Sequence, residues 1–283
     1  MKAVLDIPEA PPPELRFRHR VAMWSSLRQV WRSRELVRTL AEREYRVRYK
    51  QAFLGIAWAI MTPLALMLVF TLVFQHVARI KTGDAPYPLT SYLGLLPWTF
   101  FATSLNQGGL SLVTNVNLLN KVYCPREVFP VASMCVAAVD TLIAVSGLVV
   151  LFAIFQEVPK ITSLWLPVLI LVQVAFTLGV TLAASITIVY LRDLRYALPV
   201  ILQFGLFATP VAYTLADVPE KLQPWMVGLN PLAAVIDGYR RTVLHGQAPQ
   251  WDLLGIAAIT STIVLFGGYA LFKRFETGIA DVA

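Results

Sequence analysis

Asp140 is the ionisable residue whose position most needs a chemical explanation, because it lies near the middle of the apolar stretch Val128–Phe155. A carboxylate at membrane depth is costly unless it is paired, hydrated or protonated. A proton relay needs further ionisable groups at similar depth, and within the apolar stretches only His76 offers one. We therefore interpret Asp140 as a packing or cavity-lining residue rather than a proton carrier.

The sequence motifs supply no energy source. No G-x-x-x-x-G-K-[ST] segment is present to cradle nucleotide phosphates. No stretch carries the set of buried carboxylates expected of an ion-coupled pump, and no internal repeat is evident. Cys124 and Cys135 indicate neither a disulfide nor a metal site. Any work that this chain does must be powered by another polypeptide.

Six long apolar stretches must position these residues. A helix needs about 20 apolar residues to cross a bilayer. The chain is 57% hydrophobic and 14% charged, with a mean hydropathy of +0.63, which a soluble domain of this size would not reach without exposing large apolar patches. The predicted crossings are Phe53–Val77, Ser91–Val113, Val128–Phe155, Leu164–Leu191, Tyr196–Tyr213 and Leu253–Phe272.

The uneven distribution of basic residues predicts the orientation. Residues 1–52 hold 12 Lys and Arg, and the segments predicted on their side of the membrane raise the count to 18, against 6 on the other side. Because basic residues favour the cytoplasmic side, both termini are predicted to be cytoplasmic. Orientation also explains the net charge of +7, so no nucleic-acid partner is inferred.

Residues 35–52 have the pattern of an amphipathic helix at the inner membrane surface. Two roles for this helix stay open, a lipid anchor and a docking surface for a cytosolic partner. The docking surface is considered because Glu42 and Glu44 interrupt the run of basic residues. Residues 1–34, which carry no signal-peptide pattern, are predicted to be a flexible cytosolic lead. The apolar positions are Val37, Leu40, Ala41, Tyr45 and Tyr49, and the basic ones are Arg38, Arg43, Arg46 and Lys50.

Two further segments depart from simple spans. Asn106 and Gln107 interrupt the second crossing, which predicts that it faces the bundle interior. Between Thr214 and Trp251, the short apolar pieces Trp225–Leu229 and Pro231–Leu244 are typical of re-entrant or interfacial helices near the outer surface. The predicted fold is thus an all-α membrane protein with six transmembrane helices, an N-terminal amphipathic interfacial helix and re-entrant outer helices before the last span.

Four ordered blocks resemble a known family. They resemble the ABC-2-type permeases that export polysaccharides and polyol phosphates, the Wzm and teichoic-acid exporter group, and the resemblance extends over nearly the whole chain after residue 35. The sequence departs from this pattern at Cys124, where an aromatic residue is usual. The blocks are Arg48–Gly55 followed by Trp58 and Pro63, Gly94–Phe101, Lys121–Pro130, and Asn230-Pro231-Leu232.

The resemblance implies a homodimer in the bacterial cytoplasmic (inner) membrane, bound to two copies of a separate nucleotide-binding ATPase subunit. Residues 53–283 would form the ABC-2 transmembrane domain. No cofactor is expected in this chain, because ATP and Mg would lie on the partner, and the chain itself is not expected to be an enzyme. The residues assigned to ATPase coupling are Glu44, Tyr45, Arg48, Lys121, Tyr123, Arg126 and Glu127.

The implied cargo is a lipid-linked polysaccharide of O-antigen, galactan, capsule or teichoic acid type. Sugar rings have apolar faces that pack well on aromatic side chains. Aromatic residues of the first and fifth crossings are therefore candidates to line the passage, together with Asp140. They are Phe70, Phe74, Phe204, Phe207 and Tyr213.

Three alternatives stay open. An ABC-2 permease could instead carry a drug or a lipid without a glycan. An integral membrane enzyme acting on a polyprenyl-linked sugar would need a cluster of ionisable groups at a membrane face, and Asp193 beside Arg192 and Arg195 is the nearest comparable group. A structural scaffold would not need the interrupted second crossing.

Overall fold

The computed structural model describes residues 31–50, 54–77, 85–119 and 124–276, and across these ranges all regular structure is helical. Of the predicted lead over residues 1–34, residues 1–30 lie outside the described residues, as do Lys121, Tyr123 and the side chain of His76. The α-helices are α2 (Arg34–Tyr49), α3 (Trp58–Phe70), α4 (Tyr87–Thr114), α5 (Val116–Leu119), α6 (Val128–Phe155), α7 (Leu166–Tyr190), α8 (Leu194–Ala208), α9 (Gln223–Leu229), α10 (Leu232–Val243) and α11 (Trp251–Phe275).

Four helical segments of the described chain are long and apolar enough to cross a membrane. They are Gly55–Gln75, Val128–Phe155, Ile161–Tyr190 and Trp251–Phe275. The first joins a 3₁₀ turn (Gly55–Ala57), α3 and a π-helical segment (Thr71–Val77). This confirms the predicted all-helical membrane protein, whereas six crossings stay a prediction.

The other two predicted crossings differ from these four for separate reasons. Helix α4 has 28 residues, but polar residues such as Asn106 and Gln107 lower its hydropathy. Helix α8 has only 15 residues, about 22 Å of helix, which is shorter than a hydrocarbon core of about 30 Å. It ends at Ala208, and Thr209 has extended backbone, as the residue before a proline favours.

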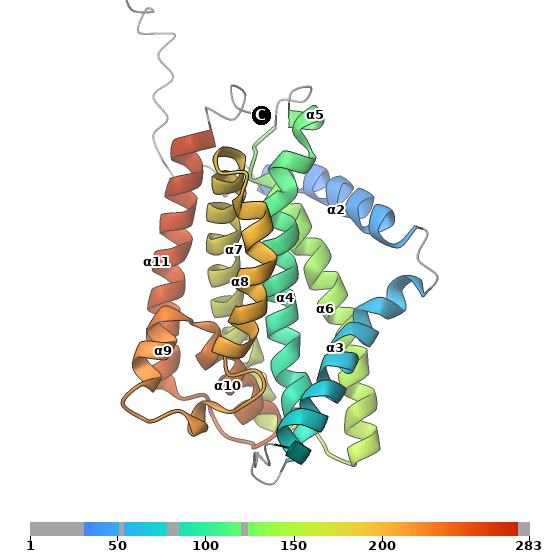
Figure 1. Ribbon diagram of the computed structural model, residues 1–283, viewed down its shortest axis with the longest axis vertical. Helices are drawn as coiled ribbons and strands as arrows, with labels where there is room; N and C mark the ends of the chain where they lie inside the picture. Colours follow the sequence, from blue (N-terminus) through green and yellow to red (C-terminus); the bar gives the residue numbers. More distant parts are fainter. Residues whose placement is uncertain (1–30, 51–53, 78–84, 120–123, 277–283) are drawn as a thin grey trace, which may run out of the picture.

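The helices form an upright bundle with small elements at both ends (Figure 1). Helices α2 and α5 and the end of α11 lie at one end. We call it the elbow end, because the charged segment 121–127 that precedes α6, which we call the elbow, holds four of the residues assigned to ATPase coupling. Helices α9 and α10 lie at the opposite end. Their lengths of 7 and 12 residues are too short to span a bilayer. Two short helices thus occupy the segment predicted to be re-entrant, and re-entrance itself stays a prediction.

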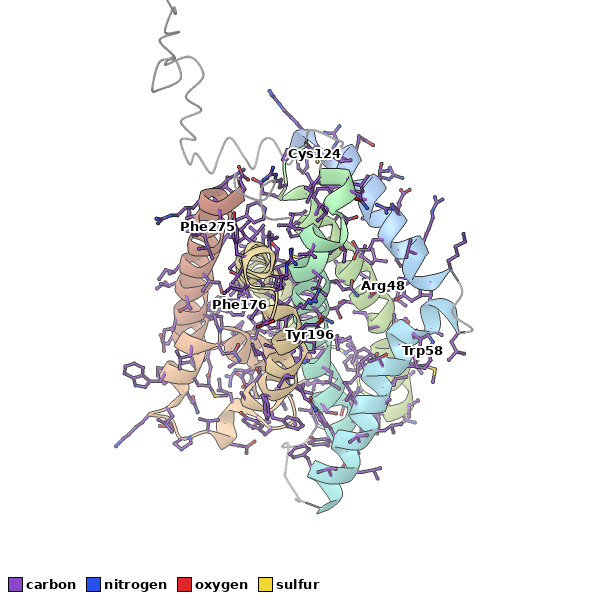
Figure 2. The ribbon with its side chains drawn as sticks, turned by 45° about the horizontal axis from the view of Figure 1, so that its top comes forward. Arg48, Trp58, Cys124, Phe176, Tyr196 and Phe275 are labelled. Atoms are coloured by element: carbon purple, nitrogen blue, oxygen red, sulfur yellow. The ribbon has the colours of Figure 1, made fainter. Side chains whose placement is uncertain are left out.

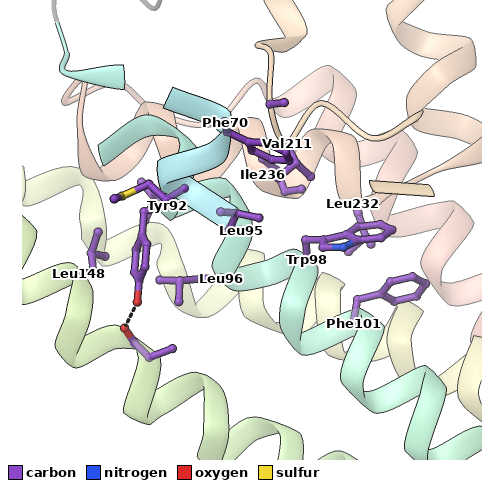
Figure 3. Close-up of a cluster of buried hydrophobic side chains, with 14 of the residues drawn as sticks. Phe70, Tyr92, Leu95, Leu96, Trp98, Phe101, Leu148, Val211, Leu232 and Ile236 are labelled. Atoms are coloured by element: carbon purple, nitrogen blue, oxygen red, sulfur yellow. Dashed lines mark hydrogen bonds between the residues drawn. The ribbon is translucent and has the colours of Figure 1, made fainter. Parts of the chain in front are cut away.

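Helix α4 is the centre of the bundle and contacts α3, α6, α7, α8 and α10. Its buried side chains form much of the main hydrophobic core, including Tyr92, Leu95, Trp98 and Phe101 (Figure 3). The hydroxyl of Tyr92 donates a hydrogen bond of 2.7 Å to the backbone carbonyl of Ala144 on α6. The prediction that the interrupted second crossing faces the interior is therefore confirmed.

Helices α7 and α11 approach each other through glycines. A Cβ on Gly179 would lie 2.6 Å from the carbonyl oxygen of Val264, and one on Gly268 would overlap the backbone of Gly179. Small residues allow such backbone contact between membrane helices, where packing supplies much of the association energy. This pair fixes α11 against α7.

A buried arginine holds the opposite end of the bundle together. Arg240 on α10 is 3% exposed. Its guanidinium donates hydrogen bonds to the carbonyls of Thr90, Pro210, Val211 and Tyr213. Because these bonds satisfy carbonyls on two other segments, Arg240 joins α10 to the start of α4 and to the turn after α8.

Candidate functional site

The amphipathic helix α2 lies across the elbow end and packs on α6 (Figure 1). Leu40 packs beside a buried cluster that contains Leu112 of α4 and Phe129 of α6. Cys124 packs on the same cluster, so α2 and the described part of the elbow share one hydrophobic contact region. The helix itself is as predicted, with Arg34–Tyr49 observed against residues 35–52 expected.

An ion pair joins the C-terminal end of α2 to the middle of α6. The guanidinium of Arg48 donates through Nη1 to Asp140 Oδ2, and the hydroxyl of Tyr49 donates to Asp140 Oδ1 at 2.8 Å. The side chains of Arg48 and Asp140 are 21% and 16% exposed. Asp140 thus has two partners on α2, which offsets the cost of a carboxylate within a membrane helix. Hydrogen bonding to Asp140 and burial raise the pKa of Tyr49 to about 12, burial being the larger cause.

Glu44 forms the second polar contact between α2 and α6. Ser133 Oγ donates to Glu44 Oε2 at 2.9 Å, and Arg48 Nη2 lies 3.7 Å from Glu44 Oε1. Burial raises the pKa of Glu44, an effect that the Ser133 hydrogen bond and the charge of Arg48 oppose. The ring of Tyr45, the other coupling candidate on α2, packs at a tilt of 60° against the ring of Tyr49, with the centroids 4.9 Å apart. Three of the sequence-predicted coupling residues, Glu44, Tyr45 and Arg48, therefore surround one contact with α6.

The elbow is tied to the far end of the chain by a second ion pair. Glu127, which precedes α6, is 3% exposed, and Lys273 Nζ in the last turn of α11 pairs with its Oε1. Lys273 also donates to both carboxylate oxygens of Glu276, at 3.0 and 2.9 Å. Arg126, beside Glu127, has a buried Nη1 with no hydrogen-bond partner among the described residues. The elbow therefore contacts α11 as well as α6.

Lys273 was not singled out from the sequence. It was counted only among the basic residues that predict the orientation. Nothing in the spacing of residues around Lys273 indicates a contact with Glu127, which is 146 positions away. The available signal was a lysine in the last turn of an apolar helix, a position that favours cations. That signal does not name a partner.

The candidate passage residues separate into buried and exposed rings. Phe70 is 3% exposed and packs edge-on against Phe74 at 5.6 Å, and its ring lies 6.3 Å from that of Phe207 on α8. Phe204 is 73% exposed and Phe207 is 52% exposed, so the surface of α8 presents two rings. Tyr213 is half-buried after α8 and donates to the carbonyl of Ala208 at 3.3 Å. Phe70 and Phe207 thus bring α3 and α8 together, with Phe204 facing outward.

The cluster of ionisable residues around Asp193, which the alternative of a membrane enzyme would require, lies on an exposed surface. Arg192 and Asp193 lie between α7 and α8, Arg195 lies in the first turn of α8, and all three are exposed. Arg195 donates to the hydroxyl of Tyr196 at 2.7 Å and lies over that ring at 4.6 Å. Within the residues that the structure describes, no group of three or more His, Cys, Asp or Glu could hold a metal ion.

The long apolar helices and the amphipathic helix at one end of the bundle define a helical, multi-pass membrane protein. The chain belongs to the ABC-2 type transporter family, whose match extends over residues 35–244. It is 29% identical to the O-antigen export system permease protein RfbA of Myxococcus xanthus, over 90% of this chain and 98% of that protein. It is 26% identical to RfbA of Klebsiella pneumoniae over 88% and 95% of the two chains, and 26% identical to the polysialic acid transport protein KpsM of Escherichia coli over 85% and 93%.

Proposed function

We propose that this chain is the permease subunit of an ABC transporter that exports a lipid-linked polysaccharide across the cytoplasmic membrane. Its relatives named for O-antigen export and polysialic acid transport support this cargo class. The observation that carries the proposal is the architecture of the elbow end, where α2 and the elbow are each joined by an ion pair to a long helix of the bundle. Motion of either element would be transmitted to the membrane.

The proposed energy source is a separate ATPase, which would hold the ATP and Mg. Two copies of it would dock at the elbow end of two permease copies, with α2 and the elbow as the contact surfaces. Closure of the ATPase pair would push on these surfaces, and the Arg48–Asp140 and Glu127–Lys273 pairs would carry the push into α6 and α11. The predicted Lys121 and Tyr123 contacts belong to the same proposal. The elbow end would face the cytoplasm, in agreement with the excess of basic residues there.

The passage is proposed to lie between the two copies, beside α3 and α8. Exposed rings at Phe204 and Phe207 favour this surface, because they offer apolar faces to sugar rings. Residues 53–283 would then act as one transmembrane domain. An enzymatic role is less well supported, because the group at Asp193 lies on an exposed turn and nothing there would exclude water from a reaction.

Lipid-extract mass spectrometry of cells depleted of this protein tests the proposal. Accumulation of a full-length lipid-linked glycan in the cytoplasmic leaflet is expected, and it would also identify the cargo. Loss of the glycan at an early biosynthetic step would instead indicate an enzyme. Unchanged glycans would indicate that the permease carries a drug or a lipid without a glycan.

A further inference from the structure

A cavity of about 330 Å³, partly open to the surface and lined by both polar and apolar side chains, is formed by α2, α3, α4 and α6 of a single permease copy. This volume is at the small end of ligand pockets, which measure about 300–1,000 Å³. Its lining residues all belong to one subunit, and α3 contributes both to this cavity and to the surface proposed for the passage. Its lining residues include Arg48, Tyr49, Trp58, Thr62, Thr103 and Asp140.

Helix α4 supplies a polar stripe to this cavity. Thr99, Thr103 and Gln107 follow one another at four-residue spacing and line the cavity together, as expected of residues on one helix face. The stripe continues through Ser111 and Asn115, which line a second cavity of about 230 Å³ beneath α2. Gln107 borders both cavities. A polar track therefore leads from the elbow end toward the middle of the bundle.

The lining is rich in hydrogen-bond acceptors. The hydroxyls of Thr62, Thr99 and Thr141 donate to backbone carbonyls of their own helices, which leaves oxygen lone pairs as their remaining capacity. The Oε1 atom of Gln107 is buried and has no hydrogen-bond partner among the described residues. Leaving a buried acceptor unsatisfied is unfavourable, because it has lost its hydrogen bonds to water. A ligand that brings donors would recover part of this cost.

One donor of the cavity is free, because Arg48 Nη2 is buried and has no hydrogen-bond partner among the described residues. Arg48 pairs with Asp140 and lies near Glu44, and the Tyr49 hydroxyl donates to Asp140. The charges of Arg48 and Asp140 cancel, so the cavity offers no excess positive charge. Phosphate oxygens only accept hydrogen bonds and favour free cationic donors. Because the free Arg48 donor lies beside the carboxylates of Asp140 and Glu44, the lining favours a neutral ligand, whose hydroxyls both donate and accept hydrogen bonds, over a phosphate group.

An aromatic ring lies at the edge of the cavity. Trp58, in the first turn of α3, lines it and is 50% exposed. Figure 2 shows Trp58 at the start of α3 on the same side of the bundle as Arg48. An indole face offers an apolar surface to a sugar ring, while the indole N–H keeps a polar handle. Hydroxyl acceptors and an exposed tryptophan together are suited to a carbohydrate.

We propose that this cavity is a binding subsite for a neutral sugar unit of the cargo, held between α2, α3, α4 and α6. The proposal rests on the proposed export of a polysaccharide. A sugar bound here would contact both α2, through Arg48 and Tyr49, and the membrane helices. Occupancy would then be sensed by the helix that is proposed to meet the ATPase.

Protection of an introduced cysteine tests the subsite. Thr103→Cys is made in the full chain with Cys124→Ser and Cys135→Ala, and the complex with its ATPase is purified in detergent so that reagents reach both sides. The labelling rate by a small methanethiosulfonate reagent is measured with oligosaccharides released from the glycan that the cells export, and separately with inorganic pyrophosphate. At a concentration about ten times the dissociation constant, the oligosaccharide should slow labelling about tenfold.

Two additional substitutions separate binding from indirect effects. Gln107→Leu removes the unsatisfied amide from the cavity and should abolish protection of the cysteine. Thr262→Val makes a comparable loss of a polar group on the exposed face of α11 and should leave protection unchanged. Thr141→Cys on α6 provides a second probe in the same cavity if the Thr103 variant does not fold.

Three results would overturn the proposal. Protection by pyrophosphate would indicate that the cavity binds a lipid headgroup. Protection by neither compound would indicate a water-filled structural cavity. A folded cysteine variant that is not labelled at all would indicate that the cavity is closed to ligands. These failures are distinct from failure of the proposed function. Depletion that traps a lipid-linked glycan, combined with absent protection, would overturn the subsite alone, whereas depletion without effect on glycans would overturn the export proposal itself.

Discussion

Arg48 and Asp140 are 92 residues apart in the sequence, yet they form an ion pair that joins the end of the amphipathic helix α2 to the middle of α6. The ion pair has two structural consequences. It neutralises a carboxylate in a membrane helix, and it gives a basic surface helix a defined position. Tyr49 adds a second hydrogen bond to the same carboxylate. The two helices are therefore held by a specific contact as well as by apolar packing.

Asp140→Ala should weaken the attachment of α2. The side chains of the pair are 16–21% exposed, so the pair is intermediate between a surface and a buried ion pair. A surface pair contributes at most about 1 kcal/mol to stability, and breaking a buried pair costs about 3–5 kcal/mol. We expect a loss of roughly 1–3 kcal/mol, seen as a lower Tm of the purified protein and faster hydrogen exchange in α2. Replacing Arg48 as well should restore part of the loss. If Asp140→Ala and wild type exchange at equal rates, the pair does not hold α2.

The docking of α2 should also depend on pH through Glu44. Burial raises its pKa in the folded protein above the ordinary value of 4.5. Because the folded state then binds the proton more tightly than the unfolded state, this contribution to stability is lost as the pH rises through the raised pKa. Glu44→Gln keeps an acceptor for Ser133 and removes the charge. Hydrogen exchange of α2 should be slower in this variant than in wild type at pH 7, and the difference should vanish at low pH. An equal difference at both pH values would contradict this origin.

Lys273 should be required to keep Glu127 in its buried position. Lys273→Met leaves a carboxylate that is 3% exposed without its cation, and breaking a buried pair in this way costs about 3–5 kcal/mol. We expect a clear fall in Tm and in the yield of folded protein. Adding Glu127→Gln removes the uncompensated charge and should recover much of the loss. A double variant no more stable than Lys273→Met would show that the pair is not the cause.

Adjacent glycines of α11 offer a matched test of the contact with α7. Gly268→Ala would drive its Cβ into the backbone of Gly179, whereas a Cβ on Gly267 meets nothing within 4 Å. Since backbone cannot give way as a flexible side chain can, Gly268→Ala should separate α7 from α11 and lower the Tm. Gly267→Ala should be neutral, or stabilising by up to about 1 kcal/mol through its higher helix propensity. Equal Tm values for the two variants would contradict the close approach.

Features that depend on local composition could be predicted from the sequence. Helix α6 has the predicted bounds Val128–Phe155, because it is a long apolar run between the polar segments at Glu127 and Gln156. The amphipathic pattern of α2 and the short helices α9 and α10 followed from periodicity and proline positions. Composition overestimated the fifth crossing, because apolar residues continue past Pro210 after α8 has ended.

Pairings between distant residues could not be predicted in this way. Asp140 was expected to pack or line a cavity, and no sequence pattern distinguishes Arg48 from the many other basic residues before it as the partner. The orientation of α3 was also hidden, since it is apolar on every side and no amphipathic stripe marks its buried face. Phe70 is 3% exposed while its neighbours Leu68 and Val69 are 58% and 53% exposed. Such choices depend on which helices pack together.

Aromatic residues on α8 give a test of where the passage lies. Phe204 is 73% exposed in the single chain, so Phe204→Ala creates no cavity and should leave the Tm unchanged. If its ring lines the passage for sugar rings, export of the lipid-linked glycan should slow, which is measured as glycan reaching the cell surface per unit time. Phe266→Ala, at a 53% exposed position on α11, is the matched control and should export normally. Phe70→Ala would not serve the same purpose, because emptying a buried aromatic site costs about 3–5 kcal/mol. Equal export by the Phe204 and Phe266 variants would place the Phe204 ring against lipid and move the passage away from this face of α8.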